Sequence, residues 1–269
     1  MDYLMKTTLI ALFTLIAIAG CKTSPTGRTQ IALYSDSEMN SMGVQSFKQL
    51  KEQKLINSDT NVNRYVQCVA DNVISVLPKK YANQQWEVIL FEDDSANAFA
   101  LPGGKIGIHT GLLKIATNQN QLATVLGHEI GHVIAEHSNE RASQGNLLQY
   151  GMQATNAVLQ TQNVKYQVEI MSALGMGAQY GVVLPFSRTH ETEADNVGLD
   201  LMAKAGFNPK ESVTLWQNMS KAGNGATPEF LSTHPAPTSR ISELRARMPA
   251  VMKLKNAATQ SGLKPNCKF

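Results

Sequence analysis

The stretch Gly127-His128-Glu129-Ile130-Gly131-His132 decides the fold. Residues four apart lie on one face of a helix, so His128 and His132 can present ring nitrogens to a single metal ion. Zinc suits such a pair, because it binds imidazole well and a catalytic zinc uses three protein ligands plus a water. Glu129, rotated by about 100° from His128 on a helix, can take a proton from that water. Apolar residues on both sides of the stretch predict a buried helix over 120–138.

A second segment offers the remaining ligand. Residues 187–195 are Ser-Arg-Thr-His-Glu-Thr-Glu-Ala-Asp, within a helix predicted over 187–205. Glu191 is the candidate third ligand, and Asp195 one turn later would accept a hydrogen bond from a ligand imidazole and set its tautomer. We expect Glu193 to point elsewhere and to be solvated. The alternative for the whole segment is an acidic helix on the surface.

Several motifs, taken together and in this order, resemble those of the gluzincin peptidases, a family that includes HtpX, the CAAX prenyl protease, the mitochondrial Oma-type protease and BepA-like periplasmic enzymes. The motifs are Asn97-Ala98-Phe99-Ala100, Gly103-Gly104, the stretch 127–132, residues 187–195, and Ser-Thr-His-Pro-Ala-Pro-Thr-Ser-Arg-Ile at 232–241. The resemblance covers residues from about 30 to 248. It implies an α+β, mostly helical, zincin-type metallopeptidase domain with a small β-sheet beside the HExxH helix. It also implies one Zn²⁺ per chain, held by His128, His132 and Glu191, with Asp195 behind the ligands.

The chain also departs from parts of this family. HtpX and the prenyl protease cross the membrane several times, and no such spans are expected here. About twenty residues follow Met248, so the long helical repeat domain of BepA-like enzymes is not expected either. The nearest type within the family is a compact lipoprotein peptidase. We therefore expect the peptidase domain at residues 35–248 and a C-terminal tail at 249–269.

The N-terminus has the pattern of an exported lipoprotein. Lys6, a short apolar run over 8–19 and the ending Ile18-Ala19-Gly20-Cys21 predict a signal peptide at residues 1–20 and lipid attachment at Cys21. Residues 21–34, polar and containing proline and glycine, predict a tether between the lipid and the domain. Lys22, rather than an aspartate, follows the cysteine and favours the periplasmic side of the outer membrane. An ordinary signal peptide or a retained anchor is the alternative.

The expected activity is that of a zinc-dependent endopeptidase for misfolded or specific envelope proteins in the periplasm. Its expected partners are unfolded or extended polypeptides, the membrane through the N-terminal lipid and, as a further candidate, the outer-membrane assembly machinery. One alternative is a zinc-stabilised chaperone or assembly factor with little proteolysis, against which the intact Glu129 argues. Another is an amidase for cell-wall peptide. The 24 basic and 21 acidic residues give a net charge of +3, too mild to indicate nucleic acid binding.

Two further residues are candidate catalytic groups. His234 and Arg240 follow the last core helix and could stabilise the oxyanion of the reaction. Arg240 could instead anchor the loop by pairing with a carboxylate. His234 could cap a turn before Pro235, or bind the zinc as a removable fourth ligand that masks the enzyme.

The cysteines suggest a disulfide. If Cys21 carries lipid, Cys68 and Cys267 remain as an even pair in an oxidising compartment, and we expect them to bond. Two free thiols are the alternative.

The other predicted elements complete a mostly helical domain. Strands are expected at 86–91, 97–101 and 105–109, and the last of these could be an exposed edge that pairs with a substrate peptide, or an internal strand. Residues 145–185, rich in Met, Gly, Ala and Gln, predict one or two helices that either form a lid or pack in the ordinary way. Further helices are predicted at 36–53, 61–77, 209–220 and 238–247. The last of them ends at Arg247.

Overall fold

The computed structural model describes residues 21–162, 164–179, 184–222, 229–234 and 238–268. The chain divides into two compact units. The first combines Met1–Glu38 with Glu136–Ser187, and the second combines Met39–Ala135 with Arg188–Phe269. Of the two expected active-site segments, 127–132 and all of 187–195 except Ser187 fall in the second unit.

The first unit begins with a small hairpin where a tether was expected. β1 (Cys21–Thr23) pairs antiparallel with β2 (Thr29–Ile31). Gly27 makes the turn with φ +89°, a conformation that glycine adopts without strain. Arg28 then forms a double hydrogen bond at 2.7 Å with the buried carboxylate of Glu140 on α6 (His137–Thr161), which holds the hairpin to that helix. The prediction of a tether over 21–34 is therefore wrong for residues 21–31, which fold as this hairpin.

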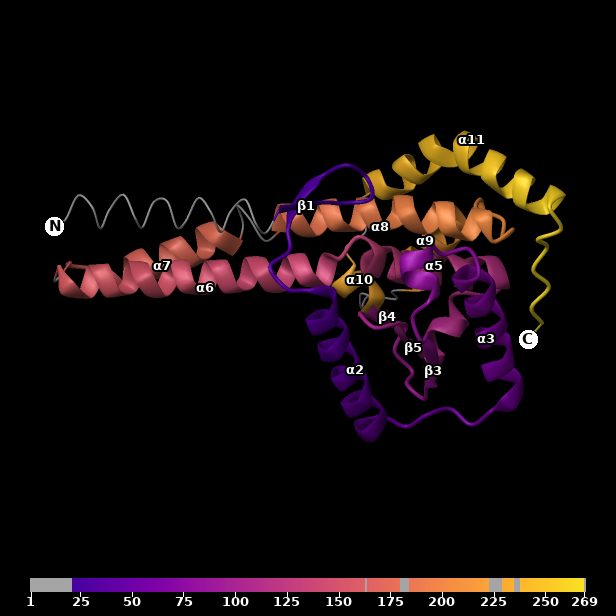
Figure 1. Ribbon diagram of the computed structural model, residues 1–269, viewed down its shortest axis with the longest axis horizontal. Helices are drawn as coiled ribbons and strands as arrows, with labels where there is room; N and C mark the ends of the chain where they lie inside the picture. Colours follow the sequence, from indigo (N-terminus) through magenta and orange to yellow (C-terminus); the bar gives the residue numbers. More distant parts are fainter. Residues whose placement is uncertain (1–20, 163, 180–183, 223–228, 235–237, 269) are drawn as a thin grey trace. The chain divides into compact units, whose positions relative to one another are not determined.

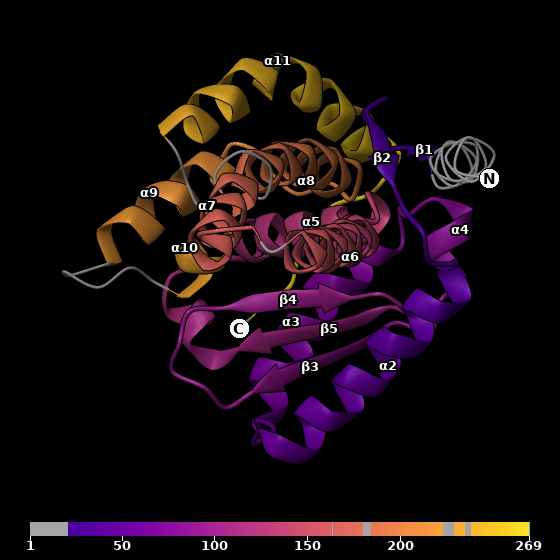
Figure 2. The ribbon, with the colours of Figure 1, turned by 90° about the vertical axis from the view of Figure 1, so that its left-hand side faces the viewer.

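A helical hairpin makes up the rest of the first unit. α6 is followed by α7 (Gln167–Ala178), and the two helices run side by side (Figures 1 and 2). The side-chain amide of Gln167 donates to Asn156 Oδ1 at 2.7 Å across the pair. These are the helices expected over 145–185, of which residues 163 and 180–183 lie outside the described part.

The second unit is built on a three-stranded sheet in the order β3-β5-β4 (Figure 2). β3 (Glu87–Phe91) runs parallel to β5 (Lys105–His109), and β4 (Ala98–Leu101) runs antiparallel to it. The β4–β5 turn passes through two glycines with positive φ, Gly103 and Gly104. Because β5 is the central strand, the expectation of an exposed edge at 105–109 is wrong and the internal-strand alternative holds; β3 and β4 are the edge strands of this sheet.

Helices cover this sheet and carry the core. Three helices precede the sheet in the sequence: α2 (Asp36–Gln53), α3 (Thr60–Ile74) and α4 (Lys79–Ala82). The 3-10 helix η1 (Thr110–Lys114) and α5 (Gln119–Ile134), which carries the stretch 127–132, follow it. Local capping explains where several begin. Asp59 and Asn118 accept backbone hydrogen bonds at the starts of α3 and α5, and Ser35 and Glu38 form a capping box at the start of α2.

Helix α5, which carries His128 and His132, ends earlier than predicted. Its last residue is Ile134, and Glu136 adopts a left-handed φ of +54° before α6 begins at His137. The hydroxyl of Tyr81 donates to the carbonyl oxygen of Ile134 at 3.0 Å, which satisfies one group of the last turn. The apolar periodicity that predicted a helix to residue 138 could not reveal this break.

The remaining helices of the chain are α8 (Leu184–Lys204), α9 (Glu211–Ala222), α10 (Glu229–Thr233) and α11 (Thr238–Gln260). α8 starts before the predicted boundary because its Pro185 lies in the first turn, where no N–H is needed. α11 runs through Pro249 as an arched helix (Figure 1). The prediction of a last helix ending at Arg247 and a tail from 249 is thus wrong for residues 249–260. Val251 is fully buried after the proline, and this packing holds the second half of α11 in place.

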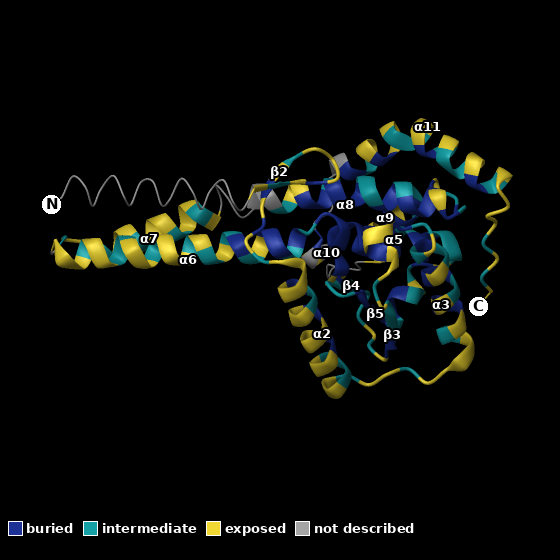
Figure 3. Ribbon diagram, viewed as in Figure 1, coloured by how far each residue is buried: buried dark blue, intermediate teal, exposed yellow. Residues whose placement is uncertain are grey.

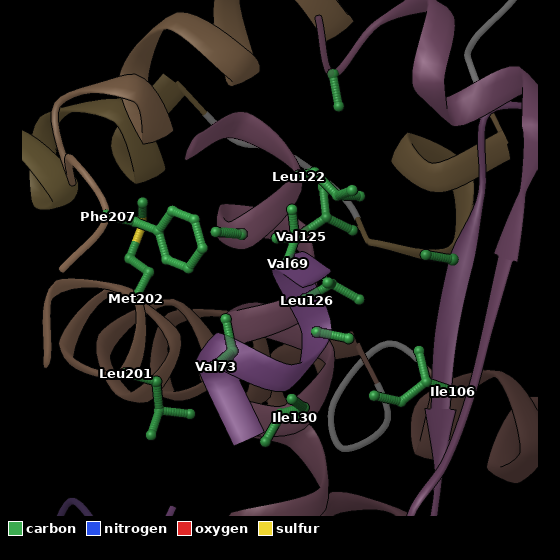
Figure 4. Close-up of a cluster of buried hydrophobic side chains, with 14 of the residues drawn as sticks. Val69, Val73, Ile106, Leu122, Val125, Leu126, Ile130, Leu201, Met202 and Phe207 are labelled. Atoms are coloured by element: carbon green, nitrogen blue, oxygen red, sulfur yellow. The ribbon is translucent and has the colours of Figure 1, made fainter. Parts of the chain in front are cut away.

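The core of the second unit surrounds α5. Leu122, Leu126 and Ile130 of α5 are fully buried, and they pack with Val69 and Val73 of α3 (Figure 4). A disulfide joins Cys68 on α3 to Cys267, with the two Cα atoms 5.7 Å apart, and so ties the C-terminal segment to this core. Among the described residues, no helix is both long and apolar enough to cross a membrane.

Candidate metal centre

α5 places three polar side chains in the interior of the second unit. His128, Glu129 and His132 have exposed fractions of only 3%, 3% and 6%. From Gln121 to Ile134, every residue of this helix except Thr124 is buried. Burying such groups without partners costs several kcal/mol, so the surroundings must compensate for it.

α8 supplies the compensation by approaching α5 very closely. A Cβ atom at Gly127 would lie 2.6 Å from the carbonyl oxygen of Gly198, and one at Gly131 would lie 2.7 Å from that of Ala194. Only glycine fits at these two crossing positions. The close approach brings Glu191 and Asp195 of α8 next to the two histidines.

Four donor atoms then converge at one point. His128 Nε2 lies 3.1 Å from His132 Nε2, 3.2 Å from His234 Nδ1 and 3.2 Å from Glu191 Oε2. The ligand atoms of these four residues all lie within 4.8 Å of one another, and all four side chains are buried. A tetrahedral zinc with bonds of about 2.05 Å separates its ligand atoms by about 3.3 Å. The residues therefore fit a zinc ion in both spacing and chemical type.

Asp195 orients the first ligand. Its Oδ1 lies 3.0 Å from His128 Nδ1, which directs the proton of the imidazole to Nδ1 and leaves the Nε2 lone pair facing the cluster. Arg240 holds Asp195 in turn, with Nε and Nη2 each donating to a carboxylate oxygen at 2.7 Å. The guanidinium stacks over the ring of Trp216 at 4.0 Å. All four side chains of this series, Trp216, Arg240, Asp195 and His128, are buried.

The electrostatics follow from this burial and these pairs. Burial lowers the pKa of His128, but its hydrogen bonds to Asp195 and Glu191 outweigh that effect and raise the pKa to about 9. Burial would raise the pKa of Glu191, yet His128 and His234 hold it well below its usual range. Four nitrogen and oxygen donors that face one another need a shared cation, which is what a metal ion supplies.

Glu129 lies beside the cluster and not in it. Its Oε1 is 3.5 Å from His234 Nε2, and burial raises the pKa of its carboxyl. The backbone of Ala100 on β4 forms a hydrogen bond with this carboxylate. The bond from His109 N to Asn97 O, at 3.0 Å, sets the alternation along β4. It turns the backbone groups of Ala98 and Ala100 away from β5, towards the side where Glu129 lies.

His234 directly follows the last residue of α10. Its backbone N–H donates to the carbonyl oxygen of Phe230 at 2.8 Å, and its ring stacks on that of Phe230. α10 is held to the start of β4 by a hydrogen bond from Phe230 N to Ala96 O at 3.0 Å. A second bond joins Asn97 Nδ2 to Glu229 Oε1 at 2.9 Å. His234 thus takes part in the cluster as a fourth donor and does not merely cap a turn.

Arg240 occupies the position of an anchor. Besides the two bonds to Asp195, its Nη1 donates to Glu191 Oε2 at 3.1 Å and to the carbonyl oxygen of His234 at 3.4 Å. Nε, Nη1 and Nη2 all donate to these partners. Arg240 therefore anchors the loop by pairing with carboxylates, and it does not present a free donor to an oxyanion.

One expectation for a neighbouring residue is wrong. Glu193, expected to be solvated, is only 3% exposed, because α8 packs on more than one side. His137 is fully buried on α6, as a structural side chain is. The roles of the crossing glycines, Trp216 and Ala100 were not among the predictions. The spacing of Gly127 and Gly131 by four residues was a usable signal for a close helix crossing, whereas Trp216 carried none.

Comparison with known proteins agrees with this geometry. Residues 60–248 match the model of peptidase family M48. The mitochondrial metalloendopeptidase OMA1 of Schizosaccharomyces pombe is 34% identical over 187 residues, which cover 69% of this chain and 52% of the relative. The OMA1 enzyme of Arabidopsis thaliana is 37% identical over 58% of this chain and 30% of its own length. The beta-barrel assembly-enhancing protease of Escherichia coli is 26% identical over 77% of this chain and 43% of its own.

The chain spans roughly a third to a half of the length of these relatives. The match to the family model, in contrast, extends over most of this chain and includes α5, α8, His234 and Arg240. The chain belongs to peptidase family M48, a family of zinc metallopeptidases.

Proposed function

We propose that this protein is a zinc-dependent endopeptidase that cleaves misfolded or specific envelope proteins. We also propose that it does so on the periplasmic side of the outer membrane, anchored by a lipid on Cys21. The observation that carries the enzymatic part is the convergence of His128, His132 and Glu191 with Glu129 beside them. A pure binding protein would need the three ligands but would have no use for a buried glutamate next to them.

Glu129 would perform the proton transfers. A zinc ion bound at the cluster would lower the pKa of its water to about 7 and polarise the scissile carbonyl. Glu129 would accept the proton of that water and later return one to the leaving amine. Its burial, together with the hydrogen bond from Ala100, holds the carboxylate in one orientation for both steps.

β4 would align the substrate. It is an edge strand, and the backbone groups of Ala98 and Ala100 face the side of Glu129. An extended polypeptide can pair with such an edge through main-chain hydrogen bonds, without demanding a particular sequence. This mode favours unfolded or extended substrates over folded ones.

His234 would mask the centre until a substrate displaces it. A catalytic zinc keeps one position for water, whereas four protein ligands close the site. The ring of His234 lies 3.1 to 3.2 Å from His128 and Glu191, in the place of the fourth ligand. Activity would then require this ring to leave the cluster.

The exposure of Cys21 and the names of two relatives support the proposed location and substrates. Cys21 is exposed at the start of β1. Two of the bacterial relatives are named as beta-barrel assembly-enhancing proteases, which favours envelope proteins as substrates here.

The first test is the cleavage of unfolded casein by the wild type and by Glu129→Gln. We expect the variant to lose about a thousandfold in kcat/KM. Glu243→Gln, at an exposed position on α11, is the matched control and should keep full activity. Equal activity of wild type and Glu129→Gln would overturn the assignment. Suppression of aggregation by a wild type that cleaves nothing would favour the chaperone alternative.

The second test addresses the masking. We expect His234→Ala to bind zinc and to cleave casein faster than the wild type, because a ligand position becomes available to water. A loss of activity comparable to that of Glu129→Gln would instead assign His234 to stabilisation of the oxyanion.

A further inference from the structure

The helix α7 is exposed although most of its side chains are apolar. Its sequence is Gln-Val-Glu-Ile-Met-Ser-Ala-Leu-Gly-Met-Gly-Ala, with Glu169 as the single charged residue, and none of its residues is buried. Val168 and Met176 are 78% and 57% exposed. Apolar side chains lie on nearly every side of the helix, a pattern found in protein cores and in membranes. Within the described part of its unit, α7 packs mainly on α6, and most of its circumference remains exposed (Figure 3).

The low charge extends over the whole hairpin. Residues 142–187 contain only two charged side chains, Lys165 and Glu169, which cancel. Soluble surfaces usually carry charges on about a quarter or more of their residues. An exposed segment of this length with so few charges is typical of a surface that binds a partner or a membrane.

The turn of the hairpin carries residues typical of a lipid–water interface. Tyr166 is 62% exposed, and the ammonium of Lys165 lies 5.1 Å from the centre of its ring. Tyr150 on α6 is 66% exposed. Tyrosine and lysine both place an apolar body in the acyl region and a polar end at the level of the headgroups.

We propose that α7 and the adjoining half of α6 dock on the surface of a phospholipid bilayer. Twelve residues of helix are about 18 Å long, well short of the roughly 30 Å of a hydrocarbon core, so α7 lies in the interface and does not cross it. A second copy of the chain would bury one side of the helix, whereas the headgroup and acyl boundary of a bilayer can contact the several apolar sides that α6 leaves exposed. Cys21, the expected lipid attachment site, belongs to the same compact unit. The contact does not depend on the metal centre, so it can fail or hold independently of the proposed activity.

The depth of α7 in a membrane can be measured with a fluorescent probe. Ser172, exposed on α7, is changed to Cys in the full chain that also carries Cys21→Ser, and the new thiol is labelled with an NBD group. We expect vesicles of phosphatidylethanolamine and phosphatidylglycerol to shift the emission to shorter wavelength, and brominated acyl chains to quench it. The same label at Asn256→Cys, exposed on α11 of the second unit, should show neither effect. An unchanged Ser172 probe would overturn the proposal.

Paired charge changes test the apolar origin of the contact. Val168→Glu with Met176→Glu should weaken vesicle partitioning at least tenfold, since two apolar anchors are lost. Gln53→Glu with Gln260→Glu introduces the same charge at exposed positions of α2 and α11 and should change it less than about twofold. Equal effects of the two pairs would contradict docking through α7. So would a probe shift that appears without vesicles as the protein concentration rises, because it would assign the surface to a second copy.

Discussion

The helices α5 and α7 depart from the ordinary distribution of side chains in opposite directions. α5 buries two histidines and a glutamate, and α7 exposes valine, leucine and methionine (Figure 3). Within the second unit the buried groups find partners, through Asp195 and Arg240 behind the histidines and Glu191 in front of them. The apolar surface of α7 has no such cover in the described part of its unit. The difference indicates that α5 serves chemistry inside the protein and α7 serves contact with something outside it.

The largest expected effect lies in the anchor behind the metal ligands. Arg240→Met should lower the free energy of unfolding of the metal-free protein by about 3–5 kcal/mol, because it leaves the buried Asp195 without its cation. Arg247→Met removes a comparable ion pair, at 2.6 Å to Asp200, that is about one third exposed on both sides. That change should cost less than about 1 kcal/mol. Urea unfolding of the two variants compares them, and equal losses would contradict the role of burial.

The disulfide is expected to stabilise the same unit. Replacing Cys68 and Cys267 by Ser should lower the free energy of unfolding by about 2–5 kcal/mol, because the bond closes a loop across a sequence separation of 199. Cys21→Ser, at an exposed position outside the disulfide, should change it by less than about 0.5 kcal/mol. Thermal unfolding under non-reducing conditions makes the comparison. An unchanged melting temperature of the double variant would show that the C-terminal segment contributes nothing to the core.

Matched leucines on the two helices give a third comparison. Leu126→Ala on α5 should cost about 2–4 kcal/mol, because the side chain is fully buried. Leu174→Ala on α7, 44% exposed, should cost less than about 1 kcal/mol in the absence of membranes. The order of the two midpoints in urea is the observable. A large loss at Leu174 would mean that α7 is a buried core element in solution, and the contrast between the helices would fail.

The sequence predicted the local part of the site and missed the part that depends on packing. His128, Glu129 and His132 lie about one helical turn apart, so spacing alone placed them. Glu191 and Asp195 followed from their own four-residue spacing and from the family resemblance. The burial of Glu193 could not be inferred, because it depends on which elements surround α8. The contact of Gly127 with Gly198 is likewise a property of two helices meeting, as is the stacking of Arg240 on Trp216.

The same distinction holds for the fold. α2 was placed correctly at 36–53, since its cap and its periodicity are both local signals. α11 was ended too early, because Pro249 usually stops a helix and only the burial of Val251 beyond it reveals that the helix continues. β5 was taken as a candidate edge, although strand order depends on pairing between distant segments. The hairpin β1–β2 was missed for the same reason, as its support comes from Glu140 more than a hundred residues away.

The central claim is that the buried cluster binds one zinc ion, and metal content by mass spectrometry tests it most directly. The purified wild type and Glu129→Gln should each contain one equivalent of zinc, because Glu129 lies beside the ligands and not among them. Glu191→Gln, which removes a charged ligand from the cluster, should retain far less. Stoichiometric zinc in all three proteins would contradict the role of Glu191, and no stoichiometric metal in the wild type would contradict the account as a whole.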